Sequence, residues 1–162
     1  PIFAFTHCRD VVVAVSKAGG HPRYDTLQPA YNLMDRAIEG PLQQLCLTEN
    51  VSIISYYGLA SGFLTGKYRS EEDLSKSPRG RGAKRYLDER GLRILAGLDT
   101  VSAGHKATPA QVALAWVMAQ PGLTGPIASA TSVEQLNDLM GSARLTLSAE
   151  DLAVLDKASA PV

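Results

Sequence analysis

Hydrophobic and polar residues follow two alternating patterns along this chain. Short apolar runs at residues 51–55 and 123–130 fit buried strands, residues 23–28 (RYDTLQ) fit a further strand, and a brief apolar stretch at residues 1–5 opens the chain. Between these runs, apolar residues recur at helical spacing, which predicts helices at 7–17, 40–50, 89–106, 108–120, 132–142 and from 148 onward. Strands therefore alternate with helices, and this alternation predicts βαβ units and a parallel sheet.

Signals at the ends of these segments support the assignment. Thr108 begins a TPAQ capping box with proline at the first helical position, and Ser132 begins a second capping box, SVEQ. Ser148 starts the last helix, which we expect to bury Leu152 and Leu155. Pro29 ends the strand at 23–28 because proline cannot donate to the ladder.

One segment breaks the alternation. Residues 67–88 read KYRSEEDLSKSPRGRGAKRYLD, which is dominated by charge, serine and glycine. This composition is too polar for a core element and predicts a long mobile loop.

Composition narrows the class of protein without identifying it. The 162 residues are 45% hydrophobic and 20% charged, which is typical of one soluble globular domain. Sixteen basic residues balance sixteen acidic ones, so no overall field favours nucleic acid or an anionic membrane. Without a long apolar span or a secretory signal pattern, we expect a cytoplasmic protein. Cys8 and Cys46 lie in helical stretches rather than in a CxxC pattern, which favours buried reduced thiols and leaves a disulfide open.

The stretch VSIISYYGLASGFLTGKY at residues 51–68 is the strongest candidate for a ligand-binding segment. A β-branched strand runs into glycines and small residues that let the backbone approach a ligand closely. This sequence resembles the loop after the seventh barrel strand of aldo-keto reductases, which are NADP(H)-dependent carbonyl reductases with a TIM-type barrel fold. The motifs YDTLQPAYNLMDR, TPAQVALAW, PIASATSVEQL and LSAEDLAVLD resemble the same family in the same order.

The resemblance implies a fold class. A closed (β/α)₈ barrel takes about 250 residues, whereas this chain holds about four parallel strand-helix units and a C-terminal helix. We therefore expect an α/β protein consisting of a partial TIM-type barrel, with residues 1–162 as a single domain that resembles the C-terminal half of an aldo-keto reductase.

The resemblance also implies contacts to the nicotinamide. Gln28, at the end of its strand, would hydrogen-bond the carboxamide, and Tyr56 would stack on the ring. The plainer alternatives are a glutamine at an exposed strand end and an ordinary core aromatic residue. Tyr57 leaves the register of the stacking tyrosine open by one residue.

Two segments are implied to bind the rest of the cofactor. Gly58, Leu59, Ser61 and Gly62 would surround the pyrophosphate with backbone amides, although GLASG alone is more often a turn. The implied contacts to the adenosine and its 2′-phosphate come from the segment after the last strand and the next helix: Ser129, Thr131, Gln135 and Asp138.

The adenosine segment departs from the family pattern. Many relatives place a lysine or arginine there, whereas residues 125–141 contain neither, so NAD(H) is possible as well as NADP(H). Arg79 and Arg81 could act as a clasp from the 67–88 segment, with a solvated charge run as the alternative. At the N-terminus, residues 3–6 read FAFT where relatives have an SN pair, so that carboxamide contact is missing or altered.

The resemblance places the catalytic Asp, Tyr, Lys and His of the family in the first half of the barrel, which this chain lacks. Tyr68, Tyr86 and the histidines His7, His21 and His105 are better interpreted as structural or exposed residues. We therefore predict no catalytic residue and no metal site. The expected function is the cofactor-binding half of a reductase of aldehydes or ketones. The alternative is a non-catalytic dinucleotide-binding or structural fragment. Open sheet edges predict self-association or pairing with an N-terminal half.

Overall fold

The computed structural model describes residues 15–16, 18–78 and 80–161. The predicted apolar stretch at residues 1–5 and most of the predicted helix at 7–17 lie outside the described residues. Arg79, one of the two candidate clasp residues, also lies outside them. Among the described helices, none is both long and apolar enough to cross a membrane.

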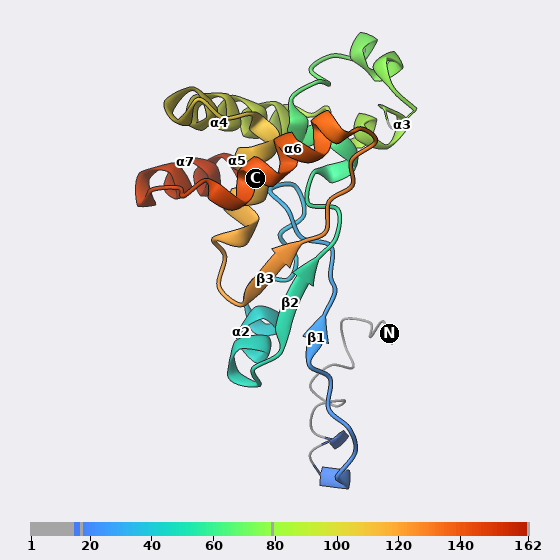
Figure 1. Ribbon diagram of the computed structural model, residues 1–162, viewed down its shortest axis with the longest axis vertical. Coiled ribbons are helices and arrows are strands. Elements are labelled where there is room, and N and C mark those ends of the chain that lie inside the picture. Colours follow the sequence, from blue (N-terminus) through green and yellow to red (C-terminus); the bar gives the residue numbers. More distant parts are fainter. Residues whose placement is uncertain (1–14, 17, 79, 162) are drawn as a thin grey trace.

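Three parallel strands form the sheet, as the alternation of elements predicts (Figure 1). They are β1 (Thr26–Leu27), β2 (Ser52–Ser55) and β3 (Leu123–Pro126), in the spatial order β1-β2-β3. Leu27 pairs with Ile53 of β2, and Ile53 also pairs with Leu123, so β2 is the central strand. The described part of the chain therefore contains three of the four predicted strands, and β1 and β3 are shorter than expected.

Helices cover the sheet and follow the predicted positions closely. They are α2 (Pro41–Thr48), α4 (Glu89–His105), α5 (Pro109–Met118), α6 (Val133–Gly141) and α7 (Ala149–Ser159). Thr108 and Ser148 form complete capping boxes with the third residues of α5 and α7, which satisfies amides that have no partner inside the helix. Before α6 only half of the predicted box forms, because Gln135 Oε1 accepts from Thr131 instead of reaching back to Ser132.

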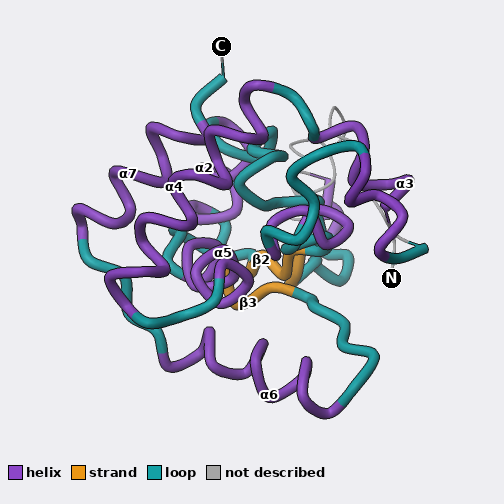
Figure 2. Tube along the Cα trace, turned by 90° about the horizontal axis from the view of Figure 1, so that it is seen from above, coloured by secondary structure: helices purple, strands orange, loops and turns teal. Residues whose placement is uncertain are grey.

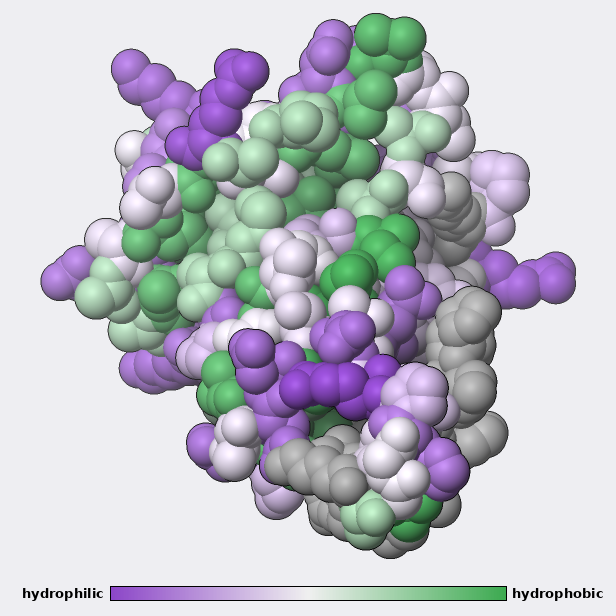
Figure 3. Space-filling model, turned by 60° about the horizontal axis from the view of Figure 1, so that its bottom comes forward, coloured by the Kyte–Doolittle hydropathy of each residue, from purple (hydrophilic) through white to green (hydrophobic). Residues whose placement is uncertain are grey.

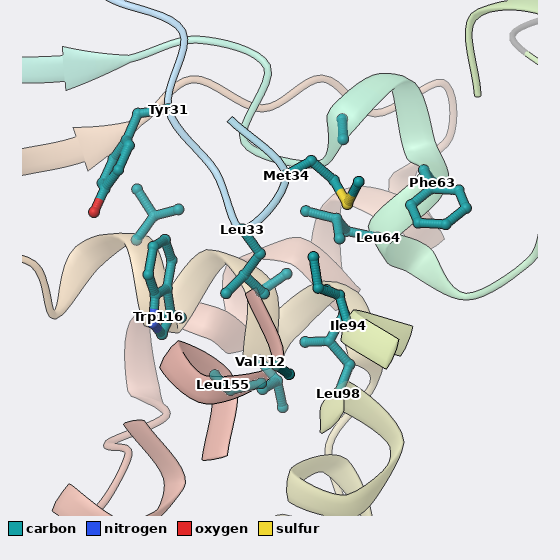
Figure 4. Packing of buried hydrophobic residues seen from close by; sticks show 14 of the residues in the cluster. Tyr31, Leu33, Met34, Phe63, Leu64, Ile94, Leu98, Val112, Trp116 and Leu155 are labelled. Atoms are coloured by element: carbon teal, nitrogen blue, oxygen red, sulfur yellow. The ribbon is translucent and has the colours of Figure 1, made fainter. Parts of the chain in front are cut away.

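The core lies where α4, α5 and α7 pack against each other and against the turn that follows β1 (Figure 4). Helix α5 is buried on almost every side, from Ala110 to Val117. Leu155 of α7 is fully buried as predicted, whereas Leu152 is only partly buried. Cys46 is buried in α2.

The 67–88 segment contains more secondary structure and more buried residues than its composition predicts. It contains the short helices η2 (Glu72–Lys76), α3 (Gly80–Ala83) and η3 (Lys84–Tyr86). Tyr68 is fully buried, with its hydroxyl 2.6 Å from Ser77 Oγ, and Tyr86 is buried against Phe63. The expectation that this segment cannot contribute to the core is therefore wrong, because a few aromatic residues anchor a chain that is otherwise polar.

Helices α4 and α7 are joined by a contact between His105 and Asp151 that makes stability depend on pH. His105 Nε2 lies 2.7 Å from Asp151 Oδ2. The hydrogen bonds from His105 and from the Ser148 amide lower the pKa of the Asp151 carboxyl below its usual value. A lowered carboxyl pKa stabilises the fold at pH values above the unfolded pKa of about 4, and this contribution disappears as the pH falls through the folded-state pKa. Asp151→Asn should cost less than about 1 kcal/mol at neutral pH, since water screens a partly exposed pair.

The measurement is urea unfolding of both proteins from pH 7 down to pH 3. We expect the difference in unfolding free energy between wild type and Asp151→Asn to shrink as the pH falls. A difference that stays constant across this range would contradict the assignment.

Candidate functional site

A cleft of about 860 Å³ lies beyond the carboxyl ends of β2 and β3. Parallel strands bring their carboxyl ends to one edge of the sheet, where α/β proteins bind ligands. In Figure 1 the chain leaves both strands at this edge and runs toward α3 and α6. The lining residues come from three segments of the chain: 56–67, 108–110 and 127–139, with Gly82 as an addition from α3.

The first wall of the cleft follows β2 and has an unusual backbone. Four residues within 57–62 have positive φ angles: Tyr57 (59°), Ala60 (47°), Ser61 (57°) and Gly62 (86°). Only glycine adopts this region without steric cost, so the conformation of the other three must be held by their surroundings. The wall is therefore a shaped loop rather than an ordinary turn.

Hydrogen bonds inside this wall determine which amides are available to a ligand. The amide of Ala60 donates to the Tyr57 carbonyl and that of Gly62 to the Leu59 carbonyl, both at 2.8 Å. Within the described residues, the amides of Gly58 and Leu59 donate no hydrogen bond to the protein. Within the predicted series of anion-binding amides, those of Gly58 and Leu59 are therefore available to a ligand, whereas that of Gly62 is engaged.

Gly58 has a second role in this wall. A Cβ atom at Gly58 would lie 2.9 Å from Leu114 Cδ2 and 3.3 Å from Pro126 Cβ. The absence of a side chain lets the loop pack directly on α5 and on the end of β3. Gly58 therefore allows close packing of the cleft wall on α5 and on the end of β3.

The second wall follows β3 and is polar. Ser129, Gln135 and Asp138 line the cleft, together with Ile127 and Leu139. The Asp138 carboxylate accepts from Thr108 Oγ1 at 3.2 Å, at the N-terminus of α5. A carboxylate is favourable beside the unpaired amides of a helix start. This wall offers hydroxyl, amide and carboxylate groups that suit sugar hydroxyls and an adenine amino group.

The cleft also contains a cation that the sequence analysis did not select. Lys67 lines the cleft, and its Nζ lies 4.9 Å from the centroid of the Tyr68 ring. A Cβ atom at Gly62 would lie 3.6 Å from the same Nζ, so the ammonium lies against the first wall. Among the described residues lining the cleft, Lys67 is the only lysine or arginine. Its position directly after the glycine-rich loop was the sequence signal that could have identified Lys67 as a site residue.

Most of the predicted cofactor-binding residues come together in this cleft. They are Tyr56, Gly58, Leu59, Ser61, Gly62, Ser129, Gln135 and Asp138. Tyr57 lines it as well, with its ring centroid 5.2 Å from that of Tyr56, so both tyrosines face the same space. Gln28 is exposed and does not line the cleft, and Thr131 is bonded to Gln135 outside it. Arg81 is exposed in α3 and does not line the cleft either.

The groups considered as proton donors have structural roles where they are described. The Tyr86 hydroxyl contacts Arg85 and donates to Asp35 Oδ2 at 3.1 Å, and burial raises the pKa of this phenol. Tyr68 is fully buried and His105 pairs with Asp151. His21 is exposed, and His7 lies outside the described residues.

Comparison with known proteins agrees with the motifs. The profile of the Aldo/keto reductase family matches residues 6–160. Aldo-keto reductase yakc (NADP(+)) of Schizosaccharomyces pombe is 30% identical over 128 residues, 75% of this chain and 38% of that protein. Protein tas of Escherichia coli is 31% identical over 137 residues, 83% of this chain and 40% of that protein.

A solved structure shows the same fold. The crystal structure of a thermostable aldo-keto reductase in complex with epalrestat matches with a TM-score of 0.66 and 23% identity, over 93% of this chain and 45% of that chain. The described strands and helices therefore form part of a TIM-type barrel. The chain spans 38% and 40% of the length of the two curated relatives. The profile match, which extends over nearly all of the sequence, shows that this chain belongs to the aldo/keto reductase family.

Proposed function

We propose that this chain is the cofactor-binding half of an NADP(H)-dependent oxidoreductase that reduces aldehydes or ketones to alcohols. The observation that carries the proposal is the cleft, in which eight of the predicted cofactor-binding residues line one space. The name of the yakc relative supports NADP(H) as the dinucleotide. The cofactor supplies the hydride when it is bound.

The residues of the cleft fit a dinucleotide. The amides of Gly58 and Leu59 and the ammonium of Lys67 suit the pyrophosphate, because backbone donors and a nearby cation favour an anion. Tyr56, Tyr57 and Ile127 give flat or apolar surface for the nicotinamide ring. The polar second wall suits the adenosine, and Gln28 remains a candidate for the carboxamide if it turns toward the cleft.

Binding should be separable from turnover. Isothermal titration of the chain with NADPH and with NADH tests the cofactor site, and NADPH oxidation with nitrobenzaldehyde tests catalysis. We expect binding without turnover, because the family's catalytic Asp, Tyr, Lys and His are proposed to lie outside this chain. Turnover by the chain alone would contradict the half-enzyme proposal, and absence of any binding would contradict the cofactor site.

Lys67→Met should weaken NADPH binding about tenfold, because Lys67 is the one lysine or arginine among the described residues that line the cleft and could form a charge-assisted hydrogen bond to phosphate. Lys67→Arg should retain most of the affinity. Lys84→Met is the matched control, since Lys84 is exposed, pairs with Glu71 and does not line the cleft. Titration at two salt concentrations gives a second check, because loss of an ionic contact also reduces the salt dependence. Equal affinities for Lys67→Met and wild type would contradict a role for this lysine.

The alternative of NAD(H) has a specific observation in its favour. The second wall carries the Asp138 carboxylate, and the described residues of that wall include no cation to pair with a 2′-phosphate. A carboxylate instead suits a ribose 2′-hydroxyl. A lower dissociation constant for NADH than for NADPH would identify NAD(H) as the cofactor.

We also propose that this chain associates with a second copy or with an N-terminal half, in the cytoplasm. Helix α6 has no buried residue, and its apolar side chains Val133, Leu136 and Met140 are 73%, 50% and 59% exposed. Figure 2 shows α6 beyond β3, apart from the other labelled helices. Figure 3 shows a broad apolar area bordered by hydrophilic side chains in another view of the surface. Exposed apolar surface of this kind favours association.

Size-exclusion chromatography with light scattering distinguishes the two partners. A dimeric mass for the chain alone indicates self-association, and a one-to-one complex with a separately expressed N-terminal half of a relative indicates pairing. A monomer that forms no complex with that half would contradict both.

A further inference from the structure

Asn32 is a fully buried amide whose hydrogen-bonding groups are all engaged. Its exposure is 0%. The side-chain Nδ2 donates to the Tyr57 carbonyl at 2.9 Å, across 25 positions of sequence. The Oδ1 accepts from the amides of Met34 at 2.8 Å and Asp35 at 3.0 Å. An amide can donate and accept at once, and here it links the turn after β1 to the loop after β2.

The turn that carries Asn32 is itself rigid. The backbone amides and carbonyls of Asn32 and Asp35 bond each other in both directions at 3.1 Å. The Asp35 carboxylate also accepts from the Tyr86 hydroxyl, which connects the turn to the 67–88 segment. Asn32 therefore has little freedom to move away from Tyr57.

The hydrogen bond from Asn32 Nδ2 to the Tyr57 carbonyl lies next to the last backbone pair between the segments that follow β1 and β2. The Tyr56 amide donates to the Pro29 carbonyl at 2.9 Å, and the Tyr31 amide donates to the Tyr56 carbonyl at 3.3 Å. One residue later, at Tyr57, the φ angle is positive and regular pairing ends. At that point Asn32 Nδ2 bonds the Tyr57 carbonyl, just past the last backbone pair between the two segments.

The residue held in this way is the first left-handed one of the cleft wall. The left-handed conformation is unfavourable for a tyrosine, so it persists only where neighbouring groups impose it. The Tyr57 carbonyl accepts from both Asn32 Nδ2 and the Ala60 amide, and the latter bond closes the turn that contains Gly58 and Leu59. The orientation of the two available amides thus depends on this carbonyl.

We propose that Asn32 is a positioning residue that holds the Tyr57 carbonyl and thereby fixes the 57–62 wall in the conformation that presents the Gly58 and Leu59 amides to the cleft. Asn32 does not line the cleft. The inference rests on the proposed dinucleotide site for its ligand. Its structural part, the fixing of the wall, holds in the unliganded chain and can be tested without a cofactor.

The test is Asn32→Asp, examined by amide hydrogen exchange of the unliganded chain and by isothermal titration with NADPH. The carboxylate keeps an acceptor for the Met34 and Asp35 amides but has no donor for the Tyr57 carbonyl, nor for Asp35 Oδ2, to which Asn32 Nδ2 donates at 3.4 Å. We expect exchange in residues 57–62 to accelerate about tenfold and NADPH affinity to fall by a similar factor, while exchange in α5 stays unchanged. Asn137→Asp is the matched control, since Asn137 is exposed on α6 and does not line the cleft.

Other outcomes overturn the proposal. Unchanged exchange in residues 57–62, or an equal acceleration there and in α5, would assign Asn32 no local effect on the wall. If Asn32→Asp does not fold, Asn32→Ser replaces it, because a serine hydroxyl can cap the turn but is too short to reach Tyr57. If wild type does not bind NADPH, the proposed function fails, and the exchange measurement alone decides the role of Asn32.

A double-mutant cycle separates positioning from general destabilisation. Tyr57→Gly removes the steric cost of the left-handed conformation, so the wall should depend less on Asn32 in that background. We expect Asn32→Asp to accelerate exchange in residues 58–62 clearly less when Tyr57 is glycine. An equal effect in both backgrounds would contradict the proposed coupling.

Discussion

Replacing Trp116 by alanine is expected to lower the free energy of unfolding by about 3–5 kcal/mol, the range observed for removal of a large buried aromatic residue. Trp116 of α5 is fully buried in the core, near Tyr31 (Figure 4). Its ring centroid lies 5.5 Å from that of Tyr31, and the Arg36 guanidinium carbon lies 5.1 Å from the Trp116 ring centroid. Its Nε1 donates to Asp156 Oδ1 of α7 at 3.2 Å. Alanine would leave a cavity and remove all three contacts.

Urea unfolding followed by circular dichroism measures this effect, because the substitution removes the only tryptophan of the chain. Trp116→Phe should cost clearly less, since it keeps an aromatic ring against Tyr31 and loses mainly volume and the N–H donor. Leu92→Ala is a control in α4, where the side chain is 46% exposed, and should change stability by less than about 1 kcal/mol. A loss under 1 kcal/mol for Trp116→Ala would contradict the packing of this residue in the core.

The pattern of the sequence predicted the helices better than the strands. Helix starts carry local signals, and Thr108 and Ser148 cap α5 and α7 as their motifs indicate. Strand length depends instead on partners that are distant in sequence. The run at 23–28 narrows to Thr26–Leu27 because only these residues pair with β2. No local pattern contains that information.

The predicted site residues that share one motif lie together in the structure. The loop 56–62 and the segment after β3 were selected by resemblance, and most of their residues line the same cleft. Lys67 and Asn32 were missed for different reasons. Lys67 belongs to a run whose charge suggested solvent exposure. The role of Asn32 depends on a side-chain bond to a carbonyl 25 residues away, which only the structure reveals.

Gly91→Ala is expected to destabilise the chain by about 2–3 kcal/mol, because it forces a side chain into a tightly packed region. Gly91 is buried in the first turn of α4, where its amide donates to Asp88 Oδ1 at 2.6 Å. A Cβ atom there would overlap the Tyr86 carbonyl oxygen and would lie 3.0 Å from Phe63 Cζ. Backbone cannot yield as a flexible side chain can, so the end of the 67–88 segment would have to move away from α4.

The same helix provides the control. Gly104, near the end of α4, has no atom within 4 Å of the position of an added Cβ, so Gly104→Ala should be neutral or stabilising by up to about 1 kcal/mol. Gly→Ala changes helix propensity in the same direction at both positions, so opposite signs of the two effects would isolate the contact of Gly91 with Tyr86. Chemical denaturation of the two variants measures both effects.

Because Tyr86 packs on Phe63, which follows the first wall of the cleft, Gly91→Ala should also weaken NADPH binding, whereas Gly104→Ala should not. Stabilisation by alanine at both positions would show that the 67–88 segment does not pack on α4 as described.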